Sequence, residues 1–414
     1  MTASARQDRV SAVVVDYKAL FVRSATPELQ GRIRHMLEYF QSQGLRVVVL
    51  STDPFDLAAL CRDWGYPALL DHISLRDIPS GKKRGSPDWV DAVTSRLTVA
   101  RHRLMYVGVT AMDWRTAINS GVFYLHAGWA APQPGKTTCL VADLPLDICT
   151  FLYHFLLRGS RWSYHLDSRQ HGLQIRALLP ASAWLPSTTP TNRATLQDVF
   201  TYERDIQVGD ASARSILMLH VLSSFYNEGL LARNSYFCVY PSSKIGQVNS
   251  QIEEYIRPAS SLVHGYYKDD LLVRHQEAPD TSLARVRARR EGRTADISIL
   301  TQSQSVSLGE KYRGKLADRS VIVFDDFTTS GMSLEWARNL LLAGGAANVT
   351  MVTIGKYKST HDTYSVKVPI DPFSQNSLTL EDFEVETLTM AYNGVVAPEL
   401  QGLFSEWISL TQTS

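Results

Sequence analysis

The sequence predicts a protein of the α/β class with two domains, each built on a parallel β-sheet. The chain has 414 residues, which is more than one hydrophobic core normally organises. Its first third alternates short apolar, β-branched runs with amphipathic helices, the pattern of a doubly wound parallel sheet. A further buried strand followed by a helix is predicted around residues 321–343, so a second sheet is expected there.

In the first third, buried strands are predicted at residues 13–15, 47–50 and 104–107. Amphipathic helices are predicted at residues 27–42 and 55–64. Because the carboxyl ends of parallel strands meet at one edge of a sheet, polar residues that follow these strands are expected to gather there. They are Asp16 and Lys18 after the first strand, Ser51 and Thr52 after the second, and Asp113 after the third.

This arrangement resembles the haloacid dehalogenase (HAD) superfamily, in which an aspartate after the first strand attacks a phosphoryl group. A serine or threonine then binds the phosphate, a lysine supports its charge, and late acidic residues complete a Mg²⁺ site. The resemblance implies that Asp16 is the nucleophile, Ser51 or Thr52 the phosphate ligand, Lys82 or Lys83 the basic residue and Asp113 a late acid.

Two positions depart from the HAD pattern. Lys18 stands where the family has its general acid, and it would pair with the Asp16 carboxylate in the space that Mg²⁺ needs. Without a carboxylate at Lys18, general-acid assistance worth about 10²–10⁴-fold is lost. Val109 replaces a late acid and removes an anionic oxygen from the Mg²⁺ site. We therefore interpret the domain as a catalytically silent scaffold. The alternative is a slow phosphatase or a phosphate sensor that uses Asp16.

The most informative segment is VIVFDDFTTSGMS, residues 321–333. It joins a predicted buried strand to a helix over residues 334–343 through two carboxylates and a hydroxyl-rich loop. Free N–H groups at a helix N-terminus suit a phosphate dianion. Asp325 and Asp326, at the carboxyl edge of the sheet, would accept hydrogen bonds from a vicinal diol. Together these features indicate a ribose 5-phosphate site, and the alternative is a capped strand-to-helix turn.

The same segment resembles the signature of the type I phosphoribosyltransferases: four apolar residues, two acidic residues and a Thr- and Gly-containing loop. The resemblance implies a parallel sheet with a flexible loop and a hood. It also implies Mg²⁺-assisted transfer of the phosphoribosyl group from phosphoribosyl pyrophosphate (PRPP) to a nitrogen acceptor, with Mg²⁺ brought by the pyrophosphate rather than by a direct protein cluster. The implied PRPP-binding residues are Asp325, Asp326, Thr328, Thr329, Ser330, Gly331 and Ser333.

Two upstream segments fit this resemblance. The β-rich run at residues 235–240 stops before Ser242, Ser243 and Lys244, the place of the family's pyrophosphate loop. Residues 268–309 lack clear periodicity and resemble the flexible loop of the ComF-like subgroup. The resemblance implies that the arginines of its charge run clamp the pyrophosphate, and a solvated basic loop or a nucleic-acid contact are the alternatives. The basic residues of that run are Arg285, Arg287, Arg289, Arg290 and Arg293.

Pro- and Gly-containing stretches suggest where the domains divide. The HAD-like domain is predicted at residues 1–130, a linker and inter-domain or hood module at 131–195, and the phosphoribosyltransferase-like domain at 196–414. Within the middle module, residues 144–158 have apolar side chains at helical spacing and residues 174–179 suggest a strand. The hood that selects the acceptor base would lie in 140–200 or 359–414.

Composition argues against several other functions. The formal net charge is +1, so no whole-protein field draws the chain to nucleic acid or lipid. No apolar run reaches membrane-spanning length, the first ten residues lack the apolar core of a secretion signal, and four cysteines are scattered without metal-binding spacing. We expect a cytoplasmic protein without a membrane partner.

The predicted function is therefore phosphoribosyl transfer from PRPP. The alternative is a regulator or effector that senses PRPP or a related phosphoribosyl nucleotide without turnover, while the HAD-like domain docks a protein partner. The combination of the two domains resembles products of bacterial stress-response and phage-defence gene clusters, which is an analogy at the level of domains.

Overall fold

A computed structural model describes residues 9–68, 70–135, 137–158, 161–188, 193–231, 234–262, 264–278 and 298–412. The chain forms two compact units. The first takes its described residues from Met1–Gly159, His220–Arg233 and Ser261–Gly265. The second takes them from Ser160–Leu219, Asn234–Ser260 and Tyr266–Ser414.

The first unit is built on a six-stranded sheet with the strand order β3-β2-β1-β4-β5-β6, in which every neighbouring pair is parallel. The three predicted strands are confirmed and lie next to one another as β2, β1 and β4. Their apolar runs form strands because both faces of the sheet are covered. The strands are β1 (Ala12–Asp16), β2 (Arg46–Leu50), β3 (Leu70–Ile73), β4 (Leu104–Gly108), β5 (Phe123–Ala127) and β6 (Leu140–Ala142).

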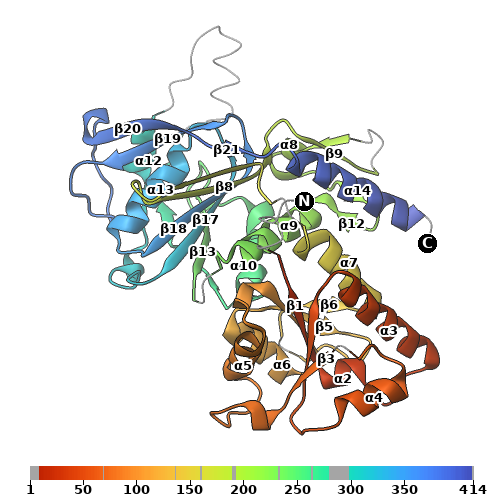
Figure 1. The fold of residues 1–414 in the computed structure, drawn as a ribbon. Helices are drawn as coiled ribbons and strands as arrows, with labels where there is room; N and C mark the ends of the chain where they lie inside the picture. Colours follow the sequence, from red (N-terminus) through yellow and green to blue (C-terminus); the bar gives the residue numbers. More distant parts are fainter. Residues whose placement is uncertain are drawn as a thin grey trace. The chain divides into compact units, whose positions relative to one another are not determined.

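Helices cover both faces of this sheet (Figure 1). Alternate residues of β1 enter two different cores, with Val13 and Val15 in one and Val14 in the other. The first core includes side chains of α3 (Pro27–Ser42), α4 (Leu57–Trp64) and α7 (Pro145–Phe151), and the second those of α5 (Asp88–Leu97) and α6 (Ala111–Ser120). The two helices predicted from the sequence are confirmed. The Asp56 side chain starts α4 two residues later than predicted by accepting a hydrogen bond from the Ala59 N–H (2.9 Å).

The first unit extends beyond the boundary predicted at residue 130. Residues 132–135 connect β5 to β6, which completes the edge of the first sheet. Helix α7 and the π-helical turn Leu152–Leu156 follow, and they bury Ile148 and Leu152 in the same core as α3. The Pro- and Gly-containing stretch is thus a connection within one unit rather than a linker between two.

The second unit is built on a seven-stranded sheet with the order β14-β13-β17-β18-β8-β7-β21. The first five strands are parallel, and β7 and β21 are antiparallel to their neighbours. The runs predicted at 174–179, 235–240 and 321–324 are confirmed as strands, and β8 from the predicted middle module lies within this sheet. The strands are β7 (Tyr164–Ser168), β8 (Leu173–Pro180), β13 (Tyr236–Val239), β14 (Tyr266–Tyr267), β17 (Ser320–Thr328), β18 (Asn348–Lys356) and β21 (Ala391–Tyr392).

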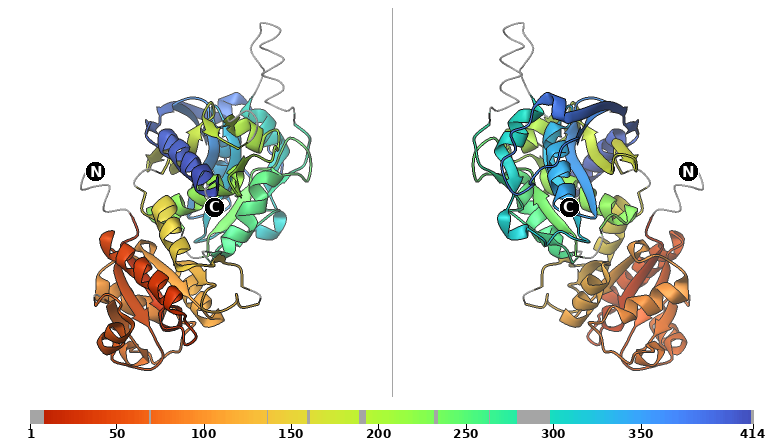
Figure 2. Two further views of the ribbon diagram at one scale, coloured as in Figure 1. Left: turned by 90° about the vertical axis from the view of Figure 1, so that its right-hand side faces the viewer. Right: turned by 90° about the vertical axis from the view of Figure 1, so that its left-hand side faces the viewer.

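Helices α12 (Ile299–Ser305) and α13 (Met332–Ala343) bury apolar side chains against one face of the second sheet. An outer antiparallel pair, β19 (Thr360–Val366) with β20 (Phe383–Thr389), packs beside α13. The C-terminal helix α14 (Val396–Gln412), dark blue in Figure 2, contacts β8 and the short strand β9 (Trp184–Pro186).

Other elements are short pairs and connecting helices. Those of the second unit are β10 (Arg193–Thr195) paired with β9, β11 (Gln207–Val208) paired with β12 (Ala211–Ser212), and the helix α8 (Leu196–Phe200). Two helices are divided between the units, because α9 (Ala213–Glu228) belongs to the first unit from His220 on and α10 (Ser250–Leu262) from Ser261 on. The segment 268–309, predicted to be irregular, begins and ends with regular structure. Strands β15 (Leu272–Arg274) and β16 (Val306–Leu308) pair in antiparallel fashion, and α12 precedes β16. Residues 279–297, with the five arginines of the charge run, lie outside the described residues.

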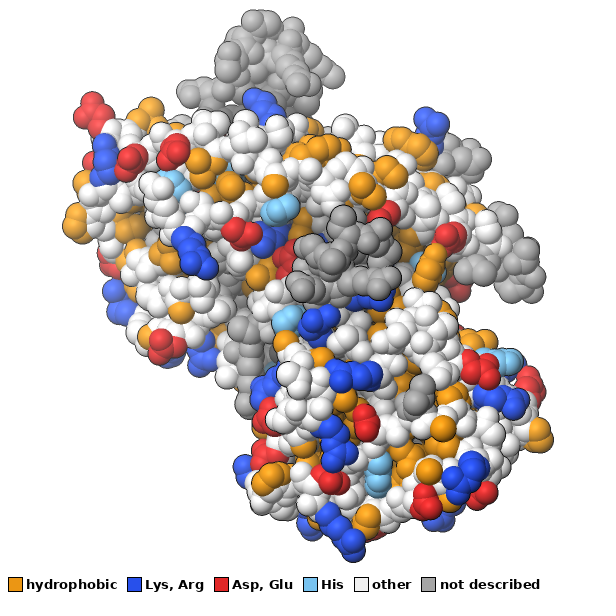
Figure 3. Space-filling model, viewed as in Figure 1, with side chains coloured by type: hydrophobic (Ala, Val, Ile, Leu, Met, Phe, Trp, Pro, Cys, Tyr) orange, Lys and Arg blue, Asp and Glu red, His pale blue; other side chains and the backbone are white. Residues whose placement is uncertain are grey.

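Among the described helices, none is both long and apolar enough to cross a membrane. On the face shown in Figure 3, positive and negative side chains are interspersed over the coloured surface, in keeping with a net charge of +1. All four cysteines are free thiols.

Candidate functional site

The signature segment lies at the carboxyl edge of the second sheet, but β17 is longer than predicted. Its pairing with β18 continues past the apolar run to Thr328, which lies opposite Lys356. Asp325 and Asp326 are therefore the sixth and seventh residues of a nine-residue strand. The loop proper is residues 329–331. Helix α13 begins at Met332 because Gly331 adopts a left-handed conformation (φ 96°), which few other residues tolerate.

Every carbonyl of the turn at residues 328–331 accepts a hydrogen bond from elsewhere in the second unit. The donors, in the order of the acceptors, are the Tyr357 N–H (3.1 Å), the Lys356 ammonium, the Asp362 N–H (3.1 Å) and the Glu335 N–H (2.8 Å). The first three come from the end of β18 and the start of β19. These hydrogen bonds fix the turn through its carbonyl oxygens.

The N–H groups of the same turn differ from its carbonyls. Within the described ranges, those of residues 329–333 donate to no protein acceptor. The first turn of a helix has no internal acceptor for its N–H groups, and the helix dipole places partial positive charge there. Such a row of free N–H groups before a 12-residue helix binds anions, phosphate above all. The hydroxyls of Thr328, Thr329, Ser330 and Ser333 lie on the same short segment.

Asp325 and Asp326 are half-buried at this edge. Burial and the neighbouring Asp326 carboxylate raise the pKa of Asp325 well above its usual range. Burial also raises the pKa of Asp326, although a hydrogen bond from the Phe327 N–H (2.7 Å) and one from Asn249 Nδ2 (3.2 Å) oppose the rise. Two crowded carboxylates of this kind gain from a ligand that brings hydroxyl donors or positive charge.

The predicted pyrophosphate loop lies on the same edge, between β13 and α10. Strand β13 pairs with β17, and the Tyr240 N–H donates to the Phe324 carbonyl (2.8 Å) directly before the acids. Ser242 and Ser243 are half-buried, whereas Lys244 is exposed. The structure therefore brings Ser242, Ser243 and Lys244 to the edge that carries the acids and the N–H groups.

Sequence reasoning did not predict several of the contacts that organise this edge. Asn249 starts α10 by accepting from the Gln251 N–H (3.0 Å) and also contacts Asp326. Arg274, at the end of β15, is buried and donates to the carbonyls of Pro241 (3.3 Å) and Ser242, so it holds the pyrophosphate loop. Lys356 could have been noticed in the sequence, because a lysine that ends the apolar run of β18 is unusual. The contacts of Asn249 and Arg274 depend on the fold and had no such signal.

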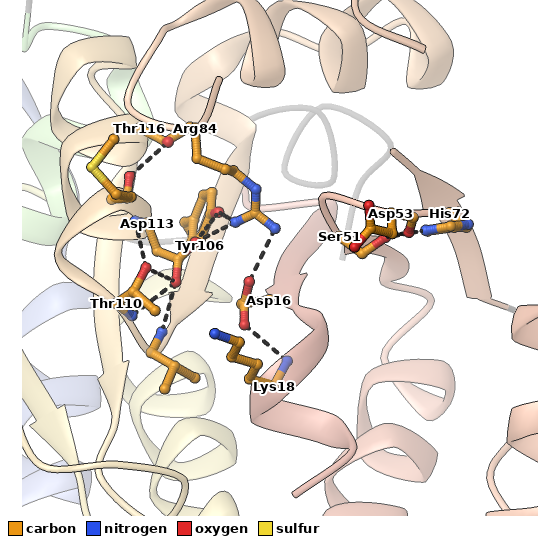
Figure 4. A network of polar contacts seen from close by, with 12 residues as sticks. Asp16, Lys18, Ser51, Asp53, His72, Arg84, Tyr106, Thr110, Asp113 and Thr116 are labelled. Atoms are coloured by element: carbon orange, nitrogen blue, oxygen red, sulfur yellow. Dashed lines mark hydrogen bonds and ion pairs between the residues drawn. The ribbon is translucent and has the colours of Figure 1, made fainter. Parts of the chain in front are cut away.

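A second polar cluster occupies the carboxyl edge of the first sheet (Figure 4). Asp16 ends β1 and caps the short helix α2 (Tyr17–Leu20), where its Oδ1 accepts from the Lys18 N–H (2.8 Å). Its Oδ2 forms an ion pair with Arg84 Nη2 (3.0 Å). Arg84 also forms an ion pair with Asp113 and donates to the Tyr106 hydroxyl (2.7 Å). Asp113 is fixed further by the Val109 N–H (3.1 Å).

The basic residue of this cluster differs from the expectation. Lys18 contributes its backbone N–H to Asp16, and the cation that pairs with Asp16 is Arg84. Of the two lysines expected in that role, Lys83 is exposed and Lys82 lies 3.5 Å from Asp88 at the surface. Arg84 reaches inward instead because its guanidinium packs over the ring of the buried Trp89 (4.9 Å).

The first unit does not fit the Mg²⁺ site of the HAD pattern. One guanidinium joins Asp16 and Asp113, and Val109 supplies no side-chain oxygen. Burial raises the pKa of Asp16 to about 6, Asp113 adds to the rise, and Arg84 opposes it. No group of three or more His, Cys, Asp or Glu residues in the described chain is placed to hold a metal ion. Arg84 thus already neutralises the carboxylates that Mg²⁺ would need.

The expected phosphate ligands of the first unit are also engaged or turned away. The Ser51 hydroxyl donates to the Asp53 carbonyl and lies 2.7 Å from His72 Nε2. Thr52 is exposed, and its carbonyl accepts from the Leu75 N–H (3.2 Å). In Figure 4 the Ser51 group stands apart from the network around Arg84. The contacts of Ser51 and the network around Arg84, which were expected to form one phosphatase centre, are therefore two separate groups of polar contacts.

No protein-family model and no curated protein sequence matches this chain. Among solved structures, a HAD-superfamily hydrolase of subfamily IA from Geobacter sulfurreducens is similar to 34% of this chain, with 96% of its own length covered, 11% identity and a TM-score of 0.27. CbbY from Rhodobacter sphaeroides, in complex with phosphate, matches 34% of this chain and 96% of its own, with 15% identity and a TM-score of 0.26.

A UMP synthase from Leishmania donovani is similar over 85% of this chain and 87% of its own length, with 11% identity and a TM-score of 0.22. At these TM-scores none of the likenesses carries an argument about the chemistry of this chain. The first unit has the doubly wound parallel sheet that the sequence predicts.

Proposed function

We propose that the second unit binds PRPP and transfers its 5-phosphoribosyl group to a nitrogen acceptor, with release of pyrophosphate. One observation carries the proposal. The turn at residues 328–331 is held through all four of its carbonyls, and among described residues no acceptor takes the N–H groups of residues 329–333 that follow. This row of donors lies directly after two crowded carboxylates. A ligand with a phosphate beside a diol matches both parts of the site, because the N–H groups suit the phosphate and the carboxylates suit the diol.

Each part of the site has a proposed role. The N–H groups of residues 329–333 would hold the 5′-phosphate, and Asp325 and Asp326 would accept hydrogen bonds from the ribose hydroxyls. Ser242, Ser243 and Lys244 would bind the pyrophosphate. When bound with the pyrophosphate, Mg²⁺ supplies charge neutralisation of the leaving group. The residues themselves would act by positioning and by preorganised electrostatics.

The first unit is proposed as a scaffold without phosphatase activity that docks a protein partner. The ion pairs of Arg84 with Asp16 and Asp113 support this role, since they engage the two carboxylates that the HAD pattern would use. An Asp16→Asn variant that keeps every activity of the wild-type protein would agree, and loss of a phosphatase activity would contradict it. A cytoplasmic location and a role in stress response or phage defence are proposed from the sequence resemblance alone.

Calorimetric titration with PRPP and Mg²⁺, followed by pyrophosphate-release assays over a panel of nitrogen bases, tests the proposal. We expect PRPP to bind to the wild-type protein, and an Asp325→Ala, Asp326→Ala variant to lose most of the affinity. A Glu381→Ala, Glu384→Ala variant is the matched control, because it removes two exposed carboxylates from the same unit.

Turnover with one base supports the transferase. Binding without turnover on any base supports instead a sensor of PRPP or a related nucleotide. Failure of PRPP to bind at all, or unchanged affinity in the Asp325→Ala, Asp326→Ala variant, would overturn both.

A further inference from the structure

Lys356 is an unusual residue for the end of a buried strand. It is the last residue of β18, and only 1% of its surface is exposed. Its ammonium group donates hydrogen bonds to two backbone carbonyls, those of Thr329 and Thr360 (2.8 Å). The first belongs to the turn that carries the free N–H groups, and the second begins β19.

This ammonium has no carboxylate partner at contact distance in the described part of the chain. Of the ion pairs found among described residues, none includes Lys356. Burial lowers the pKa of Lys356 to about 8, and the more distant Asp362 partly opposes this fall. A buried cation that only carbonyls satisfy is costly for a folded protein, and groups with pKa values perturbed in this way cluster at functional sites.

Lys356 contacts the turn on the side of its carbonyl oxygens. Its ammonium donates a hydrogen bond to the Thr329 carbonyl, while the N–H groups of Tyr357 and Asp362 donate to the carbonyls of Thr328 and Ser330. All three donors come from the chain between the end of β18 and the start of β19. The N–H groups of residues 329–333 form no protein hydrogen bond within the described chain, so they remain for a ligand.

We propose that Lys356 is a positioning residue for the ligand phosphate: its ammonium fixes the Thr329 carbonyl behind the turn and places a positive charge behind the bound anion. This inference rests on the proposed function of the second unit. It predicts that the affinity for a phosphorylated ribose follows the protonation of one buried lysine, because the deprotonated amine supplies no charge.

Few other titratable groups face this ammonium. Asp362 from β19 and Lys358 from the connection after β18 act on it most directly. The turn at 328–331 has no titratable side chain, and neither has the end of β8 opposite, Pro180. Farther along, β17 carries the acids Asp325 and Asp326, and the buried pair His361 and Glu335 (2.8 Å) packs against Gly331.

Calorimetric titration of the full chain with ribose 5-phosphate and with PRPP, from pH 7 to pH 9.5, tests the inference. Phosphate monoesters with a second pKa of about 6 are dianions over this range, so the ligand does not titrate. We expect the affinity of the wild-type protein to fall above about pH 8, by at most about tenfold per pH unit. Lys356→Met should bind about tenfold or more weakly at pH 7 and show no such fall.

Two further variants separate a positioning role from a general loss of structure. Lys356→Arg keeps its charge over the whole range, so it should bind without the fall above pH 8. Lys358→Met removes an exposed charge that lowers the pKa of Lys356, so it should bind like the wild type at pH 7 and show the same fall at slightly higher pH. If Lys356→Met does not fold, the inference is tested by comparing how the affinities of the wild type and of Lys356→Arg depend on pH.

Wild-type affinity that stays constant from pH 7 to pH 9.5, or a Lys356→Met variant that binds like the wild type, overturns the inference and leaves the proposed function standing. If the wild-type protein binds neither ribose 5-phosphate nor PRPP, the proposed function falls and the inference with it.

Discussion

Replacing Arg84 by methionine would leave two carboxylates of the first unit buried without their shared cation. The side chains of Arg84, Asp16 and Asp113 are 9%, 8% and 2% exposed. Methionine preserves most of the packing of the arginine stem over Trp89 but none of the charge. Removing one partner of a buried ion pair costs about 3–5 kcal/mol, because the remaining charge keeps its desolvation penalty. We expect a loss of that size at pH 7.5.

The loss should depend on pH in a defined direction. The pKa of Asp16 is raised from 3.8 to about 6 in the folded state, so between these values the folded state binds more protons than the unfolded state. Wild-type stability therefore decreases as pH rises through this window, by up to about 3 kcal/mol from this group. Arg84 holds the pKa down, so without it Asp16 would stay protonated to higher pH. The loss should be smaller at pH 5 than at pH 7.5.

Hydrogen exchange measured by mass spectrometry on peptides from β1 and β4 reports locally on the first unit. A loss of about 3 kcal/mol corresponds to exchange more than about a hundredfold faster in these protected strands. Lys83→Met, on the same connection but exposed, is the control and should change stability by less than about 0.5 kcal/mol. Protection in Arg84→Met equal to that of the wild type at pH 7.5, or a loss as large at pH 5, would refute the reasoning.

Four changes in the second unit have equally definite outcomes. Asp325→Asn should raise the melting temperature of the free protein at pH 8, because the raised pKa of Asp325 marks an unfavourable carboxylate; in titrations it should weaken PRPP binding about tenfold or more. Gly331→Ala should lower the free energy of unfolding by about 2–4 kcal/mol in urea titrations, because φ is 96° and a Cβ would lie 2.1 Å from the His361 ring. Gly345→Ala, with φ 95° and its nearest neighbour at 4.0 Å, should lose only about 1–2 kcal/mol. Lys244→Met should weaken calorimetric binding of PRPP but leave that of ribose 5-phosphate unchanged, and equal effects on both ligands would contradict a pyrophosphate contact.

Much of the fold was predictable because its strands are short apolar runs buried on both faces. Helix α3 has the predicted bounds, since Thr26 and Pro27 mark its beginning in the sequence itself. The division of the chain was less predictable. Residues 144–158 and 174–179 both read as apolar elements, and only packing assigns α7 to the first unit and β8 to the second sheet.

The candidate site divides in a similar way. The order of acids, hydroxyls and glycine in residues 325–333 indicated a ribose 5-phosphate site, because strand, turn and helix there are contiguous in the chain. Which carbonyls of the turn are engaged, and hence which N–H groups stay free, depends on Lys356 and on the start of β19. In the first unit, the departures at Lys18 and Val109 predicted a silent centre, yet the partner of Asp16 was misjudged.

The sequence by itself determined the strands and helices with clear periodicity, the carboxyl edges at which polar residues gather, and the chemical types present at each edge, since these follow from local periodicity and strand direction. Only the tertiary structure decided that Arg84, rather than Lys18, neutralises Asp16 and that Lys356 supports the turn after Asp326. The physical reason is that a long charged side chain takes its partner from the whole set of groups the fold brings within reach. That set includes residues far away in the chain, as Arg84 shows, which lies 68 positions after Asp16.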